Sequence, residues 1–242
     1  IALQAVNLPL NNVPIRDLLS ERLGLPVLVD NDANVAALAE HRFGAAEGAR
    51  NAIMLTLGTG IGGGLIIDGQ PYRGSSGGGA EIGHMVIDWD GPPCQGNCRN
   101  RGCIESLCSG TAIAKLGREL AAAHPESAIG RVAAGEGEID GRALIDAALD
   151  GDEVATKGLH GVACKLGSGL SGLANIFEPD VIVLGGGVMA AGELLLGPAR
   201  QWVRDHALPP QDETPIVAAE LGPDAGMVGA AEMALETLEE RE

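Results

Sequence analysis

One histidine and three cysteines within twenty residues restrict the fold of this chain more than any other feature. His84 precedes Cys94 by ten residues, and Cys98 and Cys103 follow shortly after. One histidine and three cysteines form a complete ligand set for a tetrahedral structural zinc. The alternative is a disulfide or a group of inert buried thiols. Clusters of this kind in a chain without a secretory signal are more often metal sites, so we predict zinc.

The charge and hydropathy pattern exclude several classes of protein. The chain has 242 residues and a formal net charge of -17, which disfavours a nucleic-acid surface because contacts to phosphates need Lys or Arg. No apolar run reaches the length of a membrane-spanning helix, and the first residues lack the basic region of a signal peptide. We therefore expect a cytoplasmic protein that binds neither nucleic acid nor membrane.

The first third of the chain contains a strand followed by a polar turn and a helix. Pro14 to Leu23 is typical of a short helix ended by Gly24, and Pro26 to Val29 is predicted to be a buried strand. Asp32 follows that strand, just before a helix predicted over residues 35–43. In open α/β sheets this is where ligands bind. Asp32 can be a helix N-cap or a general base that accepts a proton from a substrate hydroxyl, and spacing alone leaves both open.

A glycine-rich segment follows the next predicted strand. Asn51 to Leu57 is typical of a strand, and we predict that Gly58 to Gly64 is a loop before a strand over 65–67 and a hairpin turn at Asp68-Gly69. Consecutive N–H groups in such a loop can hold phosphate oxygens. The spacing matches neither a P-loop nor a dinucleotide fingerprint, so the loop by itself is a weak signal.

The remaining chain is predicted to alternate helices with two further strands. The segment up to Asp140 after the first of these helices is expected to be irregular, and Cys108 and Cys164 are expected to be buried apolar residues. The expected helices cover residues 110–123, 141–149, 152–177, 193–206 and 224–238, and the expected strands cover 180–184 and 215–219.

Five segments together form a recognisable signature: Asn31 to Asn34, Leu57 to Gly64, Gly79 to His84, Gly102 to Glu105 and Val183 to Val188. In this order they resemble the ROK family of repressors, open reading frames and kinases. Within that family the chain is most similar to bacterial ATP-dependent glucokinases. The cysteine spacing departs from the family's usual Cys-x-Cys, because three residues separate Cys94 from Cys98.

The resemblance implies an α/β fold of the actin-like ATPase (ribonuclease-H-like) type, with two domains and a cleft between them. It assigns residues 1–36 to what is left of the small domain, 37–224 to the large domain, and 225–242 to a helix that returns to the small domain. The family's N-terminal Asp-x-Gly-Gly-Thr phosphate turn has no counterpart here, and the segment 7–10 resembles a later point in the family pattern. We therefore expect an incomplete small domain and poor turnover by this chain. The resemblance also implies a homodimer or a homotetramer.

The resemblance also implies an activity and its residues. It predicts phosphorylation of a hexose, glucose before others, with ATP, Mg²⁺ and a structural zinc, and with Asp32 as the catalytic base. Without the resemblance, Glu81 and Glu105 would be read as solvated surface carboxylates. The implied sugar-binding residues are Asn31, Glu81, His84 and Glu105; the metal ligands are His84, Cys94, Cys98 and Cys103; the nucleotide-binding residues are Gly58, Thr59, Gly60, Gly110, Thr111, Gly185, Gly186 and Gly187.

Two other functions compete with the kinase. The same family contains sugar-sensing transcriptional repressors, but nothing in this chain resembles a helix-turn-helix with a basic recognition helix. A sugar-binding protein without turnover is the second alternative. The presence of Asp32 and of the loop that contains Thr59 favours the kinase over both.

Overall fold

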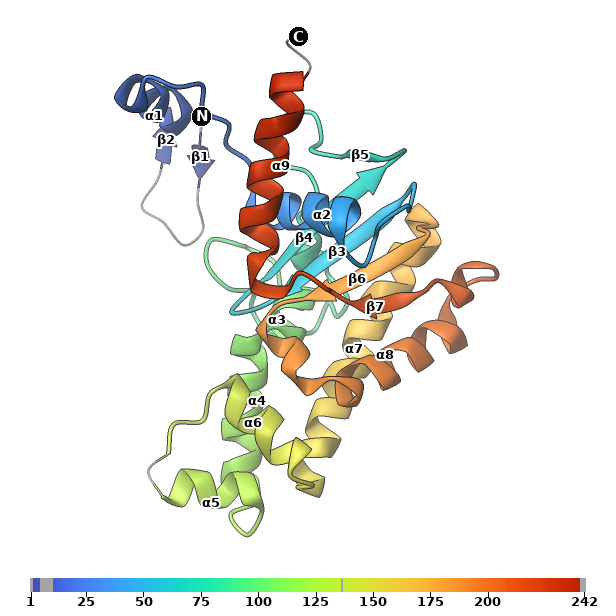
Figure 1. The fold of residues 1–242 in the computed structure, drawn as a ribbon. Helices are drawn as coiled ribbons and strands as arrows, with labels where there is room; N and C mark the ends of the chain where they lie inside the picture. Colours follow the sequence, from blue (N-terminus) through green and yellow to red (C-terminus); the bar gives the residue numbers. More distant parts are fainter. Residues whose placement is uncertain (1, 5–10, 136, 240–242) are drawn as a thin grey trace.

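A five-stranded sheet forms the centre of the molecule (Figure 1). The computed structural model describes residues 2–4, 11–135 and 137–239. The strand order is β5-β4-β3-β6-β7; β3, β4 and β5 pair antiparallel, whereas β6 runs parallel to β3 and β7 parallel to β6. The strands are β3 (Ala52–Leu57), β4 (Ile61–Ile67), β5 (Gln70–Pro71), β6 (Val181–Gly185) and β7 (Ile216–Ala218).

Both faces of this sheet are buried, and the side chains of each strand alternate between two apolar clusters. In β3, Ile53 and Leu55 belong to the larger cluster, whereas Met54 belongs to the smaller one on the opposite face. In β6, Ile182 and Val183 divide in the same way. Because successive side chains of a strand point to opposite faces, a nearly continuous apolar run such as 181–184 needs helices on both sides of the sheet.

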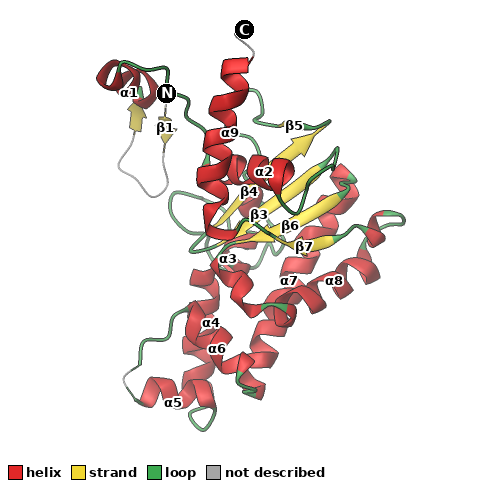
Figure 2. Ribbon diagram, in the orientation of Figure 1, coloured by secondary structure: helices red, strands yellow, loops and turns green. Residues whose placement is uncertain are grey.

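Helices supply both covers. On one face lie α7 (Glu153–Phe177) and α8 (Glu193–His206), and on the other lie α2 (Asp32–Phe43) and α9 (Ala225–Glu239) (Figures 1 and 2). At one end of the sheet, α3 (Ile104–Cys108) leads to a group of three helices, α4 (Gly110–Ala123), α5 (Ala128–Ala134) and α6 (Gly141–Leu149). The 3₁₀ helices are η1 (Ile82–His84), η2 (Gly187–Ala191), η3 (Gln211–Glu213) and η4 (Gly222–Asp224).

The N-terminal elements lie apart from the central sheet (Figure 1). Strands β1 (Ala2–Gln4) and β2 (Asn11–Val13) pair antiparallel, and α1 (Ile15–Leu23) ends at Gly24 in the left-handed conformation. Residues 7–10, which were predicted to match a later part of the family's sequence pattern, lie outside the described residues. Within the described ranges, no helix combines the length and the apolar character that crossing a membrane requires.

Most predicted elements are confirmed within one or two residues, but three predictions are wrong. Pro26 to Val29 is not a buried strand: no strand among the described residues pairs with it, and Leu28 and Val29 are exposed. The loop predicted over residues 58–64 is shorter, because β4 already begins at Ile61. The segment 124–140 contains α5, which Ser127 caps by accepting from the backbone N–H of Gly130.

Helix α2 is continuous through residue 36, where the family resemblance implies a domain boundary. Its partner α9 lies along it. Arg42 of α2 forms ion pairs with Glu232 and Glu236 of α9, and a Cβ on Gly229 would collide with the carbonyl of Val35. The absence of a side chain at Gly229 therefore allows the two helix backbones to approach closely.

Candidate functional site

The first half of β4 is the point at which the predicted sugar-site segments converge. A Cβ on Gly64 would lie 2.5 Å from the Cβ of Ala37 and 2.7 Å from the carbonyl oxygen of Ala33, and one on Gly62 would lie 2.8 Å from the Cβ of Ala33. These glycines allow the N-terminal half of α2 to lie directly on the strand. Their role is therefore close packing within β4, and they do not form a phosphate loop.

The segment that contains Glu81 and His84 lies against the same strand. A Cβ on Gly63 would collide with the carbonyl of Ala80 and with Ile82, and one on Gly83 would collide with the carbonyl of Ile61. Ala80 itself has φ 63°, a conformation that non-glycine residues rarely adopt. This strained residue directly precedes Glu81, whose side chain is exposed. Backbone strain of this kind clusters at functional sites.

The N-terminus of α2 presents Asn31 and Asp32 at this place. Asn31 is the N-cap, since its Oδ1 accepts from the N–H groups of Ala33 at 2.8 Å and Asn34 at 3.3 Å. Asp32 is the first helical residue, so the alternative in which Asp32 is the N-cap is wrong. Its exposed carboxylate accepts only from the N–H of Ala33, at 3.0 Å, among the contacts that the structure describes. Asp32 is thus free to contact a ligand.

Asp30, two residues earlier, has a different environment. Its buried carboxylate pairs with Arg73 and accepts from the side chain of Asn34 at 3.0 Å. These contacts fasten the chain entering α2 to the segment after β5. The carboxylate of Asp30 is therefore engaged within the protein, whereas that of Asp32 is not.

Glu105 approaches β4 from α3. Its Oε2 accepts from the N–H of Ile61 at 2.8 Å, and a Cβ on Gly60 would overlap that same oxygen. The other oxygen, Oε1, lies 3.7 Å from the Sγ of Cys94. Glycine at position 60 is needed because the half-buried carboxylate occupies the space of a side chain.

The predicted metal ligands form a single cluster. The ligand atoms of His84, Cys94, Cys98 and Cys103 all lie within 4.8 Å of one another. The Sγ of Cys94 is 3.5 Å from Nδ1 of His84, and the Sγ atoms of Cys98 and Cys103 are 3.9 Å apart. A zinc ion with Zn–S bonds of about 2.3 Å in a tetrahedron needs sulfurs roughly 3.8 Å apart. The four residues fit zinc in number, type and spacing.

Two antiparallel segments hold these ligands in place. The N–H of Ile104 donates to the carbonyl of Met85 at 3.0 Å, and the N–H of Cys94 donates to that of Asn100 at 2.9 Å. Gly102, between the two, has φ 62°, and a Cβ there would collide with the carbonyl of Asp88. Only glycine fits this turn, and the turn aligns Cys103 with Cys94.

The cysteines differ in environment. Burial raises the pKa values of the Cys94 and Cys103 thiols, so at neutral pH a cation is needed to hold them as thiolates. Burial likewise raises the pKa of Cys108 to about 12, and this residue is the buried apolar thiol that was predicted. Cys164 was predicted to be buried as well, but it is partly exposed on α7, 3.7 Å from Nδ1 of His160.

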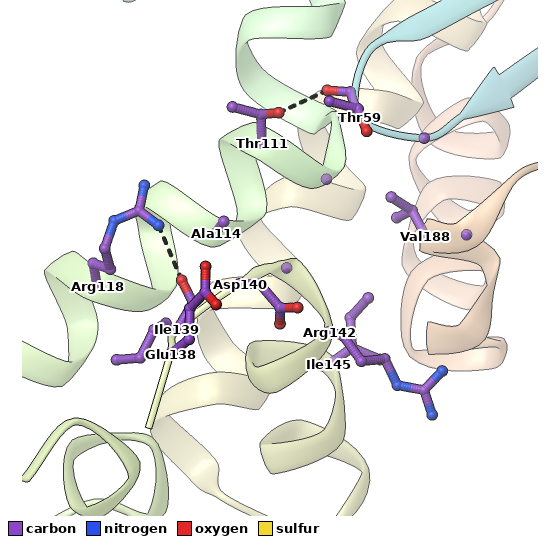
Figure 3. Close-up of a pocket in the computed structure, with 14 residues that line it drawn as sticks. Thr59, Thr111, Ala114, Arg118, Glu138, Ile139, Asp140, Arg142, Ile145 and Val188 are labelled. Atoms are coloured by element: carbon purple, nitrogen blue, oxygen red, sulfur yellow. Dashed lines mark hydrogen bonds between the residues drawn. The ribbon is translucent and has the colours of Figure 1, made fainter. Parts of the chain in front are cut away.

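A cavity of about 650 Å³ lies on the other side of the loop between β3 and β4 (Figure 3). That loop, the N-termini of α4 and α6, and η2 form its walls. In Figure 3, Thr59 and Thr111 lie together at one end and are joined by a hydrogen bond from Oγ1 of Thr111 to the carbonyl of Thr59, 2.8 Å long. The lining residues are Gly58, Thr59, Gly110, Thr111, Ala114, Arg118, Glu138, Ile139, Asp140, Gly141, Arg142, Ile145, Gly187 and Val188.

Five of the eight predicted nucleotide-binding residues line this cavity: Gly58, Thr59, Gly110, Thr111 and Gly187. The other three are not among the residues that line it. Gly60 faces Glu105. A Cβ on Gly185 would contact Met54 and Ala219 at 3.1 and 3.2 Å. Gly186 has φ 92° and lies against the backbone of Leu57.

Sequence reasoning missed the wall formed by α6 and the segment before it. Nη1 of Arg118 donates to the carbonyl of Ile139 at 2.9 Å, and Asp140 caps α6 by accepting from the N–H of Ala143 at 2.8 Å. The one available signal was the capping residue Asp140 just before a predicted helix. A Cβ on Gly141 would lie 2.7 Å from the carbonyl oxygen of Gly110, so the starts of α6 and α4 are in close contact.

Two helix N-termini border the cavity and favour an anionic ligand. They are the starts of α4 and α6, and unpaired N–H groups at a helix N-terminus favour negative charge. The charged side chains of the lining balance one another: Arg118 and Arg142 add two guanidinium groups, and Glu138 and Asp140 add two carboxylates. Arg142 pairs with Asp146, and Asp140 is the N-cap of α6. The compatibility of the cavity with a phosphate-bearing ligand therefore rests on the helix N-termini.

Comparison with known proteins identifies the family. Residues 1–237 match the ROK family. The chain belongs to this family. Its relatives include the glucokinase of Thermotoga maritima, which is 40% identical over 229 residues, covering 94% of this chain and 72% of the relative. A putative xylose repressor of a Caldicellulosiruptor species is 36% identical, covering 85% of this chain and 51% of the repressor.

Solved structures of ROK proteins establish the fold. The crystal structure of a ROK family glucokinase from Streptomyces griseus, in complex with glucose and AMPPNP, is 40% identical in sequence and has a TM-score of 0.85. The match covers 96% of this chain and 75% of that one. The chain therefore has the actin-like ATPase (ribonuclease-H-like) fold that was predicted.

Proposed function

We propose that this ROK protein phosphorylates a hexose with ATP, and that glucose is its preferred hexose. The observation that carries the proposal is the position of the loop between β3 and β4. Gly60 at one end of the loop contacts the carboxylate of Glu105, and Gly58 and Thr59 at the other end line the 650 Å³ cavity. In this proposal one short loop separates a carboxylate-rich sugar site from a cavity that can accept phosphates. The similarity to glucokinases supports a sugar kinase.

The sugar is bound by Asn31, Glu81, His84 and Glu105 in this proposal. Carboxylates accept paired hydrogen bonds from neighbouring hydroxyls, and a sugar that lacks one of these hydroxyls leaves an acceptor unpaired. Nδ1 of His84 is the ring nitrogen on the cysteine side, which leaves Nε2 for the sugar. The hydrogen bond from the N–H of Ile61 fixes the orientation of Glu105.

Asp32 is the general base. Its carboxylate is exposed at the start of α2 and is not engaged by an ion pair in the described part of the chain. It accepts the proton of the attacking sugar hydroxyl as that oxygen bonds to the γ-phosphorus and ADP departs. Positioning and charge neutralisation provide the rest of the rate enhancement.

The nucleotide occupies the cavity, with its phosphates near Thr59, Thr111 and the N-termini of α4 and α6. Mg²⁺ bound to the nucleotide would neutralise charge on its phosphates. His84, Cys94, Cys98 and Cys103 would hold a zinc ion with four protein ligands, and such an ion would organise the site without activating water. These ligands would fix the position of His84 directly and that of Glu105 through the nearby Cys103.

The test is a coupled ADP-release assay on the full-length gene product with glucose, fructose, mannose and an N-acetylated amino sugar. Glucose-dependent ADP release is expected. Asp32→Asn should still bind glucose, but its turnover rate should fall about a hundredfold or more. Asp150→Asn, at an exposed position at the end of α6, is the control and should turn over normally. Normal turnover by Asp32→Asn would assign Asp32 a structural role.

A sugar-responsive regulator is the second candidate, because the Caldicellulosiruptor repressor shares 36% identity with this chain. The net charge of -17 disfavours DNA contacts by these 242 residues. A gel-shift assay with the full-length gene product and DNA from upstream of its own gene separates the candidates. A sugar-dependent shift without ADP release would favour the regulator.

A further inference from the structure

Gln95 connects the cysteine cluster to the walls of the large cavity. It lies between the predicted ligands Cys94 and Cys98, but its side chain bonds to residues outside the cluster. Its Nε2 donates to the Oγ of Ser109 at 2.9 Å and lies 3.4 Å from the carbonyl oxygen of Thr59. None of the proposed sugar, metal or nucleotide contacts includes this residue.

The two acceptors belong to two different walls. Thr59 is in the loop between β3 and β4, and its carbonyl also accepts from Oγ1 of Thr111. Ser109 is fully buried and is the N-cap of α4. The N–H of Gly110 donates to the carbonyl of Gly58 at 2.7 Å, which holds the two walls together. The amide of Gln95 therefore adds a third hydrogen-bonded connection between the β3–β4 loop and the start of α4.

The direction of the Gln95 side chain depends on the backbone between the two cysteines. The N–H of Cys98 donates to the carbonyl of Gln95 at 3.3 Å, which closes a turn in which Gly96 has φ 57°. Cys98 ends this turn and Cys94 directly precedes it, and both cysteines belong to the four-ligand cluster. A metal that holds both sulfurs fixes the turn and, with it, the amide of Gln95.

We propose that Gln95 is a positioning residue that makes nucleotide affinity depend on occupancy of the metal site. This deepens the proposed function and rests on it. With metal bound, Gln95 holds Thr59 and the start of α4 in the arrangement that the nucleotide phosphates need. Without metal the turn loosens, the amide no longer holds both walls, and the cavity loses its shape. The metal then supports the nucleotide side of the site through Gln95, in addition to the sugar side.

The experiment measures binding of a non-hydrolysable ATP analogue by calorimetry, with the full-length gene product. Gln95→Ala removes both contacts of the amide, and its analogue affinity should fall about fivefold to tenfold. Zinc content and glucose affinity should stay at wild-type values. Asn97→Ala is the matched control, because Asn97 is exposed in the same turn and has no side-chain hydrogen bond in the described part of the chain.

A chelator provides the second arm. Removing zinc from the wild type should weaken analogue binding by a factor similar to that of Gln95→Ala, and removing it from Gln95→Ala should add little. Full additivity of the two effects would overturn the coupling. Loss of zinc together with analogue affinity in Gln95→Ala would also overturn it, because the residue would then act on the metal site itself.

Gln95→Met keeps the length of the side chain without a donor and guards against a folding defect in the alanine variant. Reduced analogue affinity in a folded Gln95→Met protein supports the proposal, and wild-type affinity overturns it. If the wild type binds glucose but no analogue, the proposed kinase function fails. If the wild type binds the analogue and both Gln95 variants bind it equally well, only the inference about Gln95 fails.

Discussion

Gly60→Ala tests whether Glu105 must occupy its observed place for sugar to bind. A Cβ at position 60 would overlap Oε2 of Glu105, and the next nearest atom is the carboxyl carbon at 3.3 Å. To restore van der Waals contact, the carboxylate has to retreat by about 1 Å. That shift breaks its 2.8 Å hydrogen bond from the N–H of Ile61. The backbone of Gly60 does not have a positive φ, so the substitution strains the side-chain contact and not the chain itself.

The magnitude follows from the lost contact and the displacement. A hydrogen bond to a charged acceptor contributes about 1.5–3 kcal/mol, and part of this is recovered from water because the carboxylate is only half-buried. A displacement of about 1 Å in a binding group can reduce catalytic efficiency about a hundredfold. We expect glucose affinity to fall at least about tenfold, which corresponds to about 1.4 kcal/mol.

Glucose titration of the full-length gene product by calorimetry, without nucleotide, measures this effect. Gly58→Ala is the matched control: its Cβ would meet only the carbonyl oxygen of Gly60, at 3.9 Å, which is an ordinary contact. Its glucose affinity should stay within about twofold of wild type. Wild-type glucose affinity in a folded, zinc-containing Gly60→Ala protein would refute the role given to Glu105.

Two further predictions concern the metal and the stability of the helical group. Metal analysis should find about one zinc per chain, and Cys103→Ser should lose zinc and glucose affinity together; a zinc-free variant that binds glucose normally would contradict the coupling. Asp152→Ala should cost about 1 kcal/mol at pH 7, because Asp152 caps α7 and also accepts from the N–H of Ile129. Burial alone would raise the pKa of Asp152, but backbone N–H donors lower it below its usual value. The ionised carboxylate of Asp152 therefore stabilises the fold fully above about pH 4, and this contribution is lost as the pH falls through the lowered pKa. Denaturant unfolding at pH 7 and at pH 3 measures this: the difference in unfolding free energy between wild type and Asp152→Ala should be smaller at pH 3.

The sequence alone determined the elements whose signals are local. The cap at Ser109 and the stop after Phe177 mark helices that the structure confirms, because capping and periodicity depend on residues a few positions apart. The metal-ligand cluster was predictable for a similar reason. The chemistry of one histidine and three cysteines leaves few alternatives, and the glycines between them permit the required turns.

Only the tertiary structure decided the roles that depend on a distant partner. Gly62 to Gly64 resemble a loop in sequence, yet they lie within β4 because α2 packs on them through Ala33 and Ala37. Pro26 to Val29 has the composition of a strand, but a strand exists only where another strand pairs with it. Arg118 and Asp140 line the cavity because the starts of α4 and α6 meet. A residue carries its own propensity, whereas its neighbours in space are set by the packing of the whole chain.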